Sequence, residues 1–510
     1  MKENKEKVFN IVILIIYISL IISMAFVHEC YIDDSQAWLI ARDLNPLQII
    51  KQMKYEGHSY LWYFLIYPLA HNNFDILFGK VYSIFFAILT AIIILKKAPF
   101  NRISKILLIF NPGMIIYYSQ VTRPYCLIPF IMVCLASIYK DKEKHPFLYS
   151  CLLGILSNTH LVMMPIVVIY AIYYWVTIFK YKFKNSSKRE KKNYILALII
   201  LCLFVINILV ITMFGAFNCR IVSRYDSIKE LIYSFLIKFA YNALEFGRFL
   251  NVDSIISAII FAIIIYSFYL IKKDIKNGIV YLLQFIFMLM IHSLFWFTIP
   301  IRAFLVIYTF MLWVWINKIE KKDNKFIKNY GILEFVLCLL LIVTYPHNYK
   351  FIIEDYTKEC NLGKSTAKYI EENIENDSVF IMASNDYQQP IAVYLKPDDY
   401  KLYSVFQDDF ITFNVWNNEY AGNHYLYEVY DAYKKLNSFN NIYVILPCKT
   451  FIDFDYREEK MLDKNIREFE DYMSNYINIE LIYKSDTDNM IKDFTIYDQT
   501  LYYIYKCTDK

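Results

Sequence analysis

The chain has few of the residues that build soluble enzymes, flexible chains or disulfide-linked modules. Only 20% of its 510 residues are charged, and it contains just 10 Gly and 13 Pro. Soluble domains have about 25% charged residues, and collagen-like or low-complexity chains need far more Gly and Pro. The 10 Cys are scattered without a C-x-x-C pair, so neither a zinc ribbon nor a redox motif is indicated. These absences exclude an ordinary soluble enzyme, a disordered chain and a disulfide-rich secreted module.

Hydrophobic residues are abundant instead: they make up 57% of the chain and gather in long uncharged runs over its first two-thirds. A hydrocarbon core about 30 Å thick needs roughly 20 apolar residues per helix, and shorter helices are tolerated where protein shields them. The sequence therefore predicts a polytopic α-helical membrane protein with about 11 transmembrane helices. The expected spans are residues 9–27, 74–95, 106–118, 127–139, 147–156, 161–179, 194–214, 254–271, 279–299, 303–316 and 331–345.

Lysine and arginine in the connecting segments orient these spans. Basic residues precede the first span and follow the second, fourth, sixth, eighth and tenth, with the largest group at residues 180–192. Because cytoplasmic loops are enriched in Lys and Arg, this alternation predicts a multi-pass protein of the cell membrane with a cytoplasmic N-terminus. The other connections and everything after Tyr345 then face outward. The first span also resembles a signal peptide, but its apolar run is long for one, and we expect an uncleaved helix.

The hydropathy predicts two domains. Residues 1–346 form the membrane domain, and residues 347–510 form an extracytoplasmic domain in which strand-like and helical runs alternate, as in a small α/β domain. The membrane domain has a long first outward loop at residues 28–73 and a further one at 215–252, with an amphipathic helix near 228–246. In the second domain, strands are expected at residues 379–383, 402–406, 442–446, 479–483 and 494–505, and helices at 364–373 and 425–436.

Acidic residues stand near the start of the first outward loop, in the segment HECYIDDSQAW. A carboxylate such as Asp33 or Asp34, just past the end of a membrane helix, can accept a proton, orient an acceptor or hold a divalent metal. Asp34 also fits a helix N-cap. Farther along the loop, His58 follows a glycine. A neutral imidazole beside a carboxylate can bind metal or phosphate, although a lone interfacial His is more often a simple hydrogen-bonding group.

Two arginines stand at expected outward starts of helices. Arg123 lies in a very short turn before Pro124, and Arg302 precedes the tenth apolar span. A cation at this depth usually faces a cavity or a partner, and a guanidinium group fits a phosphate or pyrophosphate. Arg123 equally fits a side chain that snorkels to lipid headgroups. With His160 at another outward turn and the outward carboxylates, the arginines predict a site at the outer boundary of the membrane.

The order of these motifs resembles the polytopic GT-C glycosyltransferases, in particular the polyprenyl-phosphate mannosyltransferase-like and aminoarabinose transferase-like proteins. The resemblance covers residues 9–317, and an outward α/β tail is also typical of the group. It rests on an acidic pair before a tryptophan, a G-H-S-x-L-W-Y segment, an R-P-Y turn, a T-H-L turn and an arginine before a late helix. The matching residues are Asp33, Asp34, Ala37, Trp38, Gly57, His58, Leu61, Trp62, Tyr63, Arg123, Pro124, Tyr125, His160 and Arg302.

The resemblance implies a membrane glycosyltransferase that moves a sugar, with inversion, from a polyprenyl-phosphate donor to an envelope glycan, lipid or protein outside the cytoplasmic membrane. Asp33 or Asp34 would be the catalytic base or would orient the acceptor, and Arg123 and Arg302 would bind the donor phosphate. A divalent metal is the one cofactor that the resemblance leaves open, and no nucleic acid partner is expected. The residues that would line the site are His58, Tyr125 and His160.

The chain departs from the family at two places. Many relatives have proline after the histidine, where this chain has Ser59 and Tyr60, and Gln120 stands where some members have a second acid. The second departure leaves the ligands of a metal undefined. The alternative function is a transporter or flippase of lipid-linked sugars, but the sequence shows no inverted repeat or pair of broken helices that would support transport.

The run Gly363-Lys364-Ser365-Thr366 looks like the end of a P-loop. Lys358 stands where the motif requires its first glycine, and no buried parallel strand precedes the run. We therefore do not expect a nucleotide site there.

Overall fold

The structure is a computed structural model of the whole chain. It describes residues 2–56, 58–218, 227–244, 275–295, 300–320, 327–383, 387–416, 426–450, 466–486, 488, 490–491 and 499–510. The predicted span at 254–271 and large parts of the predicted loop at 215–252 lie outside these residues. The contacts within the chain divide it into two compact units. Unit 1 comprises Met1–Ser23, Gly57–Trp62 and Val81–Lys350, and unit 2 comprises Met24–Glu56, Tyr63–Lys80 and Phe351–Lys510.

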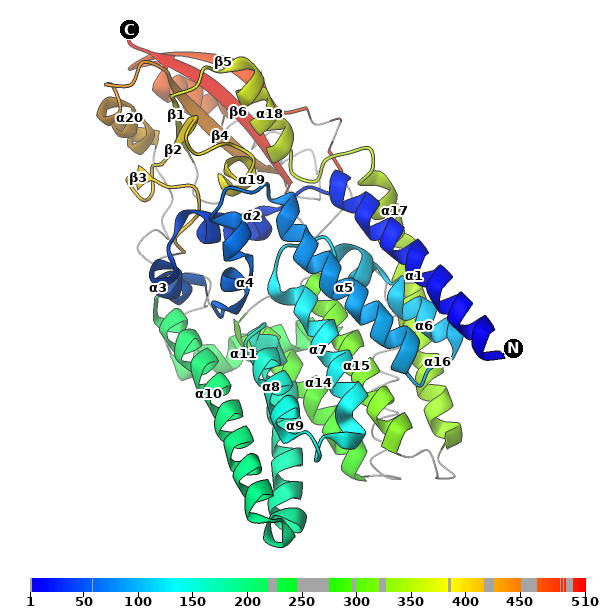
Figure 1. Cartoon of the computed structure of the whole chain (residues 1–510). Coiled ribbons are helices and arrows are strands. Elements are labelled where there is room, and N and C mark those ends of the chain that lie inside the picture. Colours follow the sequence, from blue (N-terminus) through cyan, green and yellow to red (C-terminus); the bar gives the residue numbers. More distant parts are fainter. Residues whose placement is uncertain are drawn as a thin grey trace. The chain divides into compact units, whose positions relative to one another are not determined.

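Most of unit 1 is helical (Figure 1). Among the described residues, five helices are long and apolar enough to cross a membrane, and a bent pair adds a sixth if it counts as one span. This finding supports the predicted membrane character, whereas the predicted number and orientation of the spans stay predictions. The five helices are Asn4–Val27, Leu77–Lys97, Pro124–Asp141, Leu161–Asn185 and Lys188–Ile211, and the bent pair is Gly331–Val343 with Asn348–Glu354.

The α-helices that lie wholly or largely in unit 1 overlap the predicted apolar runs in most cases. They are α1 (Lys2–Val27), α5 (Leu77–Lys97), α6 (Arg102–Ile109), α7 (Leu127–Ile138), α8 (Pro146–Ser157), α9 (Met164–Thr177), α10 (Lys188–Asn218), α11 (Ile228–Leu244), α14 (Ile275–Phe295), α15 (Pro300–Glu320), α16 (Ile327–Val343) and α17 (Tyr345–Glu354). Short 3-10 and π segments connect or extend them: η1 (Gly113–Tyr117), η2 (Pro124–Cys126), η3 (Tyr139–Asp141), η4 (Leu161–Met163), η5 (Ile178–Lys182) and η6 (Phe183–Asn185).

The predicted third span is not one helix, because α6 ends before Pro112. Proline has no backbone N–H, so it cannot bond the carbonyl of Leu108 one turn earlier. The side-chain amide of Asn111 donates to that carbonyl instead, at 2.5 Å. The next residue, Gly113, begins η1 in a place where a Cβ atom would lie only 2.9 Å from Cδ1 of Phe304. The break and the close packing redirect the chain toward the turn at residues 119–123.

Helix α10 packs against α8, and Figure 1 shows the two helices side by side. Gly154 of α8 permits this approach, because a Cβ atom there would lie 2.4 Å from Cδ2 of Phe204. On other faces of α10 large apolar side chains remain exposed, such as Leu203 at 61% and Ile206 at 55%. A helix that is apolar on all sides is typical of a membrane environment.

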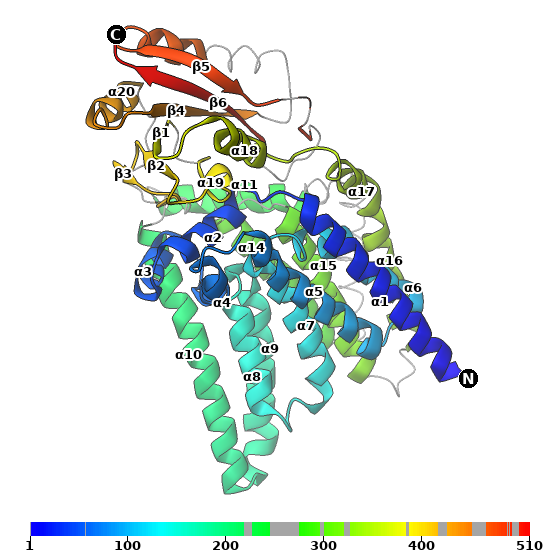
Figure 2. The ribbon, with the colours of Figure 1, turned by 45° about the horizontal axis from the view of Figure 1, so that its top comes forward.

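A six-stranded mixed sheet forms the centre of unit 2, in the order β3-β2-β1-β4-β6-β5 (Figure 2). Strand β1 pairs in parallel with β2 and β4, and the other pairs are antiparallel. All residues of β1 are buried, which is typical of a central parallel strand. The predicted C-terminal α/β fold is thus confirmed. Its elements are α18 (Gly363–Asn373), β1 (Ser378–Met382), α19 (Gln389–Ala392), β2 (Tyr400–Ser404), β3 (Asp409–Phe410), α20 (Leu426–Lys435), β4 (Ile442–Thr450), β5 (Asn478–Lys484) and β6 (Gln499–Thr508).

Most of the first predicted outward loop belongs to the same unit as this sheet. The loop forms α2 (Ile32–Asp43), α3 (Pro46–Glu56) and α4 (Leu61–Ala70), and the first two residues of α4 belong to unit 1. The predicted domain boundary after residue 346 stays a prediction, but the contacts join residues 24–56 and 63–80 to the C-terminal part of the chain.

Gln36 of α2 is the centre of the polar contacts that hold the loop to the sheet domain. Its Nε2 donates to Oε1 of Glu56 at 2.8 Å and to the carbonyl of Asn414 at 2.7 Å. Its Oε1 accepts from the backbone N–H of Asn414 at 2.9 Å and from Nε2 of Gln389 at 3.2 Å. Because Gln36 is only 1% exposed, water cannot replace these bonds if the side chain is removed.

Replacing Gln36 by Ala is therefore expected to lower the free energy of unfolding of unit 2 by about 3 kcal/mol, since several buried polar groups lose their partner. Thermal unfolding in detergent, with limited proteolysis near residues 387–416, measures the effect. The control is Gln48→Ala, because Gln48 is exposed and its side chain accepts only the N–H of Asn45 among the contacts of the described residues. Equal effects of the two substitutions would contradict the structural role of Gln36.

Candidate functional site

Five of the seven predicted site residues meet in unit 1, and we call them the arginine–histidine cluster: His58, Arg123, Tyr125, His160 and Arg302. The ring of Tyr125 stacks on His160 with centroids 5.2 Å apart, and the ring of His58 lies 5.2 Å from His160 on centroids. Nε of Arg302 donates to the hydroxyl of Tyr125 at 3.2 Å. The charges of Arg123 and Arg302 both act on His58. Segments far apart in the sequence thus supply one polar site.

The turn before Arg123 is fixed through its backbone. Oγ of Ser83 donates to the carbonyl of Val121 at 2.8 Å, and Nε1 of Trp62 donates to the carbonyl of Thr122 at 3.0 Å. Arg123 then adopts an extended conformation at the N-cap of η2, and Pro124 occupies the first turn, as the sequence predicts. The arginine is only 4% exposed, so it is not a side chain that snorkels out to lipid headgroups.

The two histidines of the cluster differ in what fixes their state, a hydrogen bond at His160 and the electrostatic environment at His58. Nδ1 of His160 accepts the backbone N–H of Val162 at 3.1 Å, so its neutral tautomer has the proton on Nε2. Burial, and then the charges of Arg123 and Arg302, hold the pKa of His58 well below its usual value. Nδ1 of His58 is buried and has no hydrogen-bond partner among the described residues. The cluster therefore has two positive charges and neutral polar groups beside them, which suits an anionic ligand.

Unit 1 also has a cleft of about 310 Å³, lined in part by Ser59 and Asn158, which are close in the sequence to His58 and His160. One side is polar: Oγ of Ser59 donates to Oδ1 of Asn158 at 3.2 Å, and Nδ2 of Asn207 donates to the same oxygen at 2.7 Å. The other side is apolar and comes mainly from α10. A cleft with one polar and one apolar side fits an amphiphilic molecule. Its apolar residues are Leu61, Ile200, Leu203 and Phe204.

The asparagines of this cleft are site residues that the sequence reasoning missed. Asn207 stands inside the apolar run of α10, and Asn158 ends α8. A polar side chain within a membrane-length apolar helix usually faces a cavity or a polar partner, and this signal would have singled out Asn207.

Asp33 and Asp34 belong to unit 2 and not to the unit of the arginine–histidine cluster. Both lie in the first turn of α2, where a negative charge is favoured by the helix dipole. The N-cap residue of α2 is Tyr31, so the alternative that Asp34 is an N-cap is wrong. Asp34 is fully buried, whereas Asp33 is partly exposed and accepts from the Tyr31 hydroxyl at 3.4 Å. Their catalytic role stays a prediction.

The described residues contain one group with metal-ligand chemistry, formed by His28, Asp355 and Cys360 in unit 2. Nδ1 of His28 lies 2.7 Å from Oδ2 of Asp355, and the thiol of Cys360 donates to Oδ1 at 3.3 Å. Burial and the nearby carboxylates hold the pKa of this thiol well above its usual value, whereas a metal binds the thiolate. The three side chains form a hydrogen-bonded group, which includes none of the predicted catalytic residues.

The protonation of His58 gives a direct test of the cluster. We expect His58 to stay neutral well below pH 6.5 in the free protein and to gain a proton more easily when a lipid phosphate offsets the two arginine charges. NMR of the protein with ¹⁵N-labelled histidine, titrated with and without undecaprenyl phosphate, measures this change, and His58→Gln assigns the signal. An unchanged pKa at saturating lipid concentration would contradict binding of a lipid phosphate at the arginine–histidine cluster.

The same lowered pKa links His58 to stability. Below about pH 6.5 the unfolded chain binds a proton that the folded His58 does not, so the free energy of unfolding falls as the pH falls.

Comparisons with known proteins add nothing to the interpretation of the site. No protein-family model matches the chain, and no curated protein matches it either.

Proposed function

We propose that the protein is a membrane glycosyltransferase of the GT-C type that moves a sugar from a polyprenyl-phosphate donor to an extracytoplasmic envelope acceptor, with inversion. The observation that supports this most is the arginine–histidine cluster. Two buried or half-buried guanidinium groups act on one neutral imidazole. The same unit has a cleft that is polar on one side and apolar on the other. A phosphate with a hydrocarbon chain matches both the charge and the cleft.

In this proposal Arg123 and Arg302 bind the donor phosphate. Negative charge grows on the phosphate oxygen as its bond to the anomeric carbon breaks. Fixed cations therefore stabilise the transition state more than the ground state. The Tyr125 hydroxyl accepts from Arg302 and has its own proton to donate to the phosphate. The apolar wall of α10 would hold the first part of the polyprenyl chain.

Asp33 or Asp34 is the proposed base. It takes the proton of the acceptor hydroxyl while the acceptor oxygen attacks the anomeric carbon from the face opposite the phosphate. The new glycosidic bond forms as the bond to phosphate breaks, so the configuration inverts and the lipid phosphate leaves with the bonding electrons. A lipid phosphate is a good leaving group and needs no separate strong acid.

The same proposal includes the finer topology. It has about 11 membrane-spanning helices, a cytoplasmic N-terminus and the C-terminal α/β domain outside the cell membrane. Short helices such as α6 and α8 fit this count, because shielded helices need not have full length. Cysteine labelling of the loop at residues 180–192 and of the C-terminus in intact cells would test the orientation.

The decisive experiment is an assay in proteoliposomes with radiolabelled polyprenyl-phosphate hexoses and pentoses, with and without envelope acceptors. Release or transfer of sugar that depends on the protein supports the transferase. Movement of intact lipid-linked sugar across the bilayer, without consumption, would instead establish the transporter alternative. Liposomes without protein provide the baseline for both measurements.

A further inference from the structure

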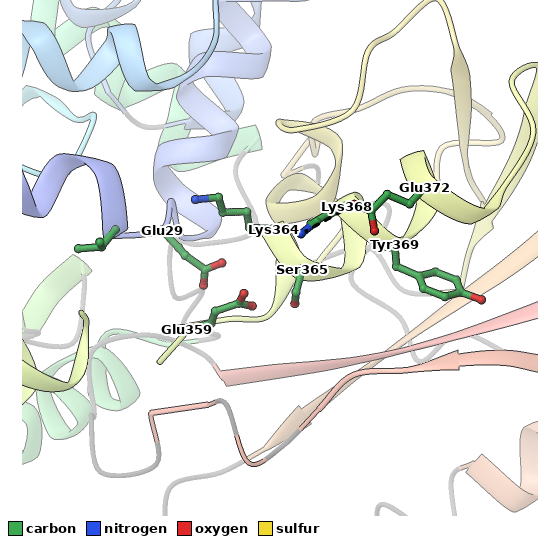
Figure 3. A pocket seen from close by; sticks show the side chains of 8 residues that line it. Glu29, Glu359, Lys364, Ser365, Lys368, Tyr369 and Glu372 are labelled. Carbon is green, nitrogen blue, oxygen red and sulfur yellow. Dashed lines mark ion pairs between the residues drawn. The ribbon is translucent and has the colours of Figure 1, made fainter. Parts of the chain in front are cut away.

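A second pocket lies wholly within unit 2, at the C-terminal end of α1 (Figure 3). Its volume is about 460 Å³, within the range of small-molecule sites. The segment after α1 forms one part of its wall, and one side of α18 forms another. Its polar lining consists mainly of Glu29, Glu359, Lys364, Ser365 and Lys368, beside the ring of Tyr369. We call it the Glu29 pocket.

The buried part of the Glu29 pocket is acidic. Glu29 is only 3% exposed, and its Oε2 accepts the backbone N–H groups of Cys360 at 2.9 Å and Asn361 at 3.2 Å. Its Oε1 is buried without a hydrogen-bond partner among the described residues, and so is Oε2 of Glu359. Figure 3 shows the two carboxylates turned toward one another. Buried acceptors of this kind favour a ligand that brings N–H donors and positive charge.

The side formed by α18 is basic. Lys364 and Lys368 stand one turn apart on this helix, both exposed at the pocket, and Lys368 pairs with Glu372 at 3.8 Å (dashed line in Figure 3). Lys364 lies in the first turn of α18, where the helix dipole adds positive potential. The helix comes close to α19 because Gly363 has no side chain: a Cβ atom there would lie 2.5 Å from the Pro390 carbonyl. This part of the pocket suits a phosphate.

We infer that the Glu29 pocket binds a small group with a primary ammonium and a phosphate a few bonds apart. The ammonium would lie against Glu29 and Glu359, and the phosphate against Lys364 and Lys368. An ammonium has three donors for the two unpartnered carboxylate oxygens. The phosphoethanolamine head group of a lipid and a phosphoethanolamine group on a soluble molecule both have this chemistry. The inference is independent of the proposed transferase.

The affinity is expected to depend on pH. Burial, and then the charge of Glu359, raise the pKa of Glu29 to about 8, while Lys364 lowers it in part. Below that pH a proton competes with the ammonium for Glu29, so binding strengthens as the pH rises from 7 to 9. Three buried neighbours, Cys360, Tyr394 and Tyr502, stay neutral over this range, because burial raises the pKa of each. Lys368 and Glu372, which form an ion pair, also line the pocket.

The test measures binding of three matched compounds to the full-length protein in detergent by calorimetry. O-phosphoethanolamine has both charges, ethyl phosphate lacks only the ammonium, and ethanolamine lacks only the phosphate. We expect O-phosphoethanolamine to bind at least roughly tenfold more tightly than either of the others. Glu29→Gln should lower its affinity by roughly tenfold and abolish the rise with pH, and Lys364→Met should lower it at all pH values. Glu371→Gln, an exposed change on the same helix outside the pocket, is the control.

Equal binding of ethyl phosphate and O-phosphoethanolamine would overturn the inference, as would unchanged binding to Glu29→Gln. If that variant does not fold, Glu359→Gln tests the other carboxylate of the proposed ammonium site, and unchanged affinity there has the same meaning. Nanodiscs distinguish the two sources of the ligand. Weaker binding of O-phosphoethanolamine in phosphatidylethanolamine than in phosphatidylglycerol nanodiscs supports a lipid head group, and equal binding in both supports a soluble ligand.

Discussion

Replacing Arg302 by Met is expected to lower kcat/KM for sugar transfer by roughly 100-fold to 1,000-fold, and Arg123→Met should have a similar effect. Both guanidinium groups act electrostatically on His58, and Arg302 also donates to the Tyr125 hydroxyl. A charge-assisted hydrogen bond to the donor contributes to binding, and it strengthens as negative charge develops on the departing phosphate. Initial rates in proteoliposomes, together with donor affinity, measure both effects.

Two substitutions provide the controls, Arg302→Lys at the same position and Arg102→Met at a distant one. Arg302→Lys keeps the positive charge but loses the planar fork, so it should recover only part of the activity. Arg102→Met removes an exposed arginine whose pair with Glu6 is worth little, and it should leave the rates unchanged. If Arg302→Met and Arg102→Met transfer sugar equally well, the arginine–histidine cluster does not bind the donor.

The second large effect is expected at the acidic pair of α2. Replacing the proposed base, Asp33 or Asp34, by Asn should lower the rate of transfer by roughly 100-fold to 10,000-fold. The hydroxyl of the sugar acceptor then has no base to take its proton. Donor binding should persist, since no donor contact is assigned to Asp33 or Asp34. Asp33→Asn and Asp34→Asn are assayed separately, and the one that loses transfer but still binds donor identifies the base.

Asp75→Asn is the matched control for this pair. Asp75 is exposed, and its Oδ1 accepts the backbone N–H of Leu77 at 2.7 Å, a contact that asparagine also makes. Its rate should equal that of the unchanged protein. Should Asp33→Asn and Asp34→Asn both retain full transfer, the proposed base is wrong even if the arginines prove essential.

Helices and strands that are determined by residues close together in the sequence could be predicted. Long apolar runs predicted the helices from α5 to α10, because a helix in a membrane must satisfy its own backbone and bury its side chains in lipid or protein. Runs of β-branched and aromatic residues predicted five of the strands to within a few residues. The exception is the third span, where Pro112 and the packing around Gly113 end the helix early.

The sequence by itself thus determined the membrane character, the C-terminal α/β fold and the kinds of residues that could bind a phosphate. Tertiary structure alone decided which of them meet. Arg302 reaches Tyr125 across 177 positions of the chain, and Gln36 reaches Asn414 across 378. Hydrophobic periodicity reports only on neighbours along the chain, whereas such contacts depend on how whole helices and strands pack. For the same reason no local pattern revealed that Glu29 and α18 form one pocket.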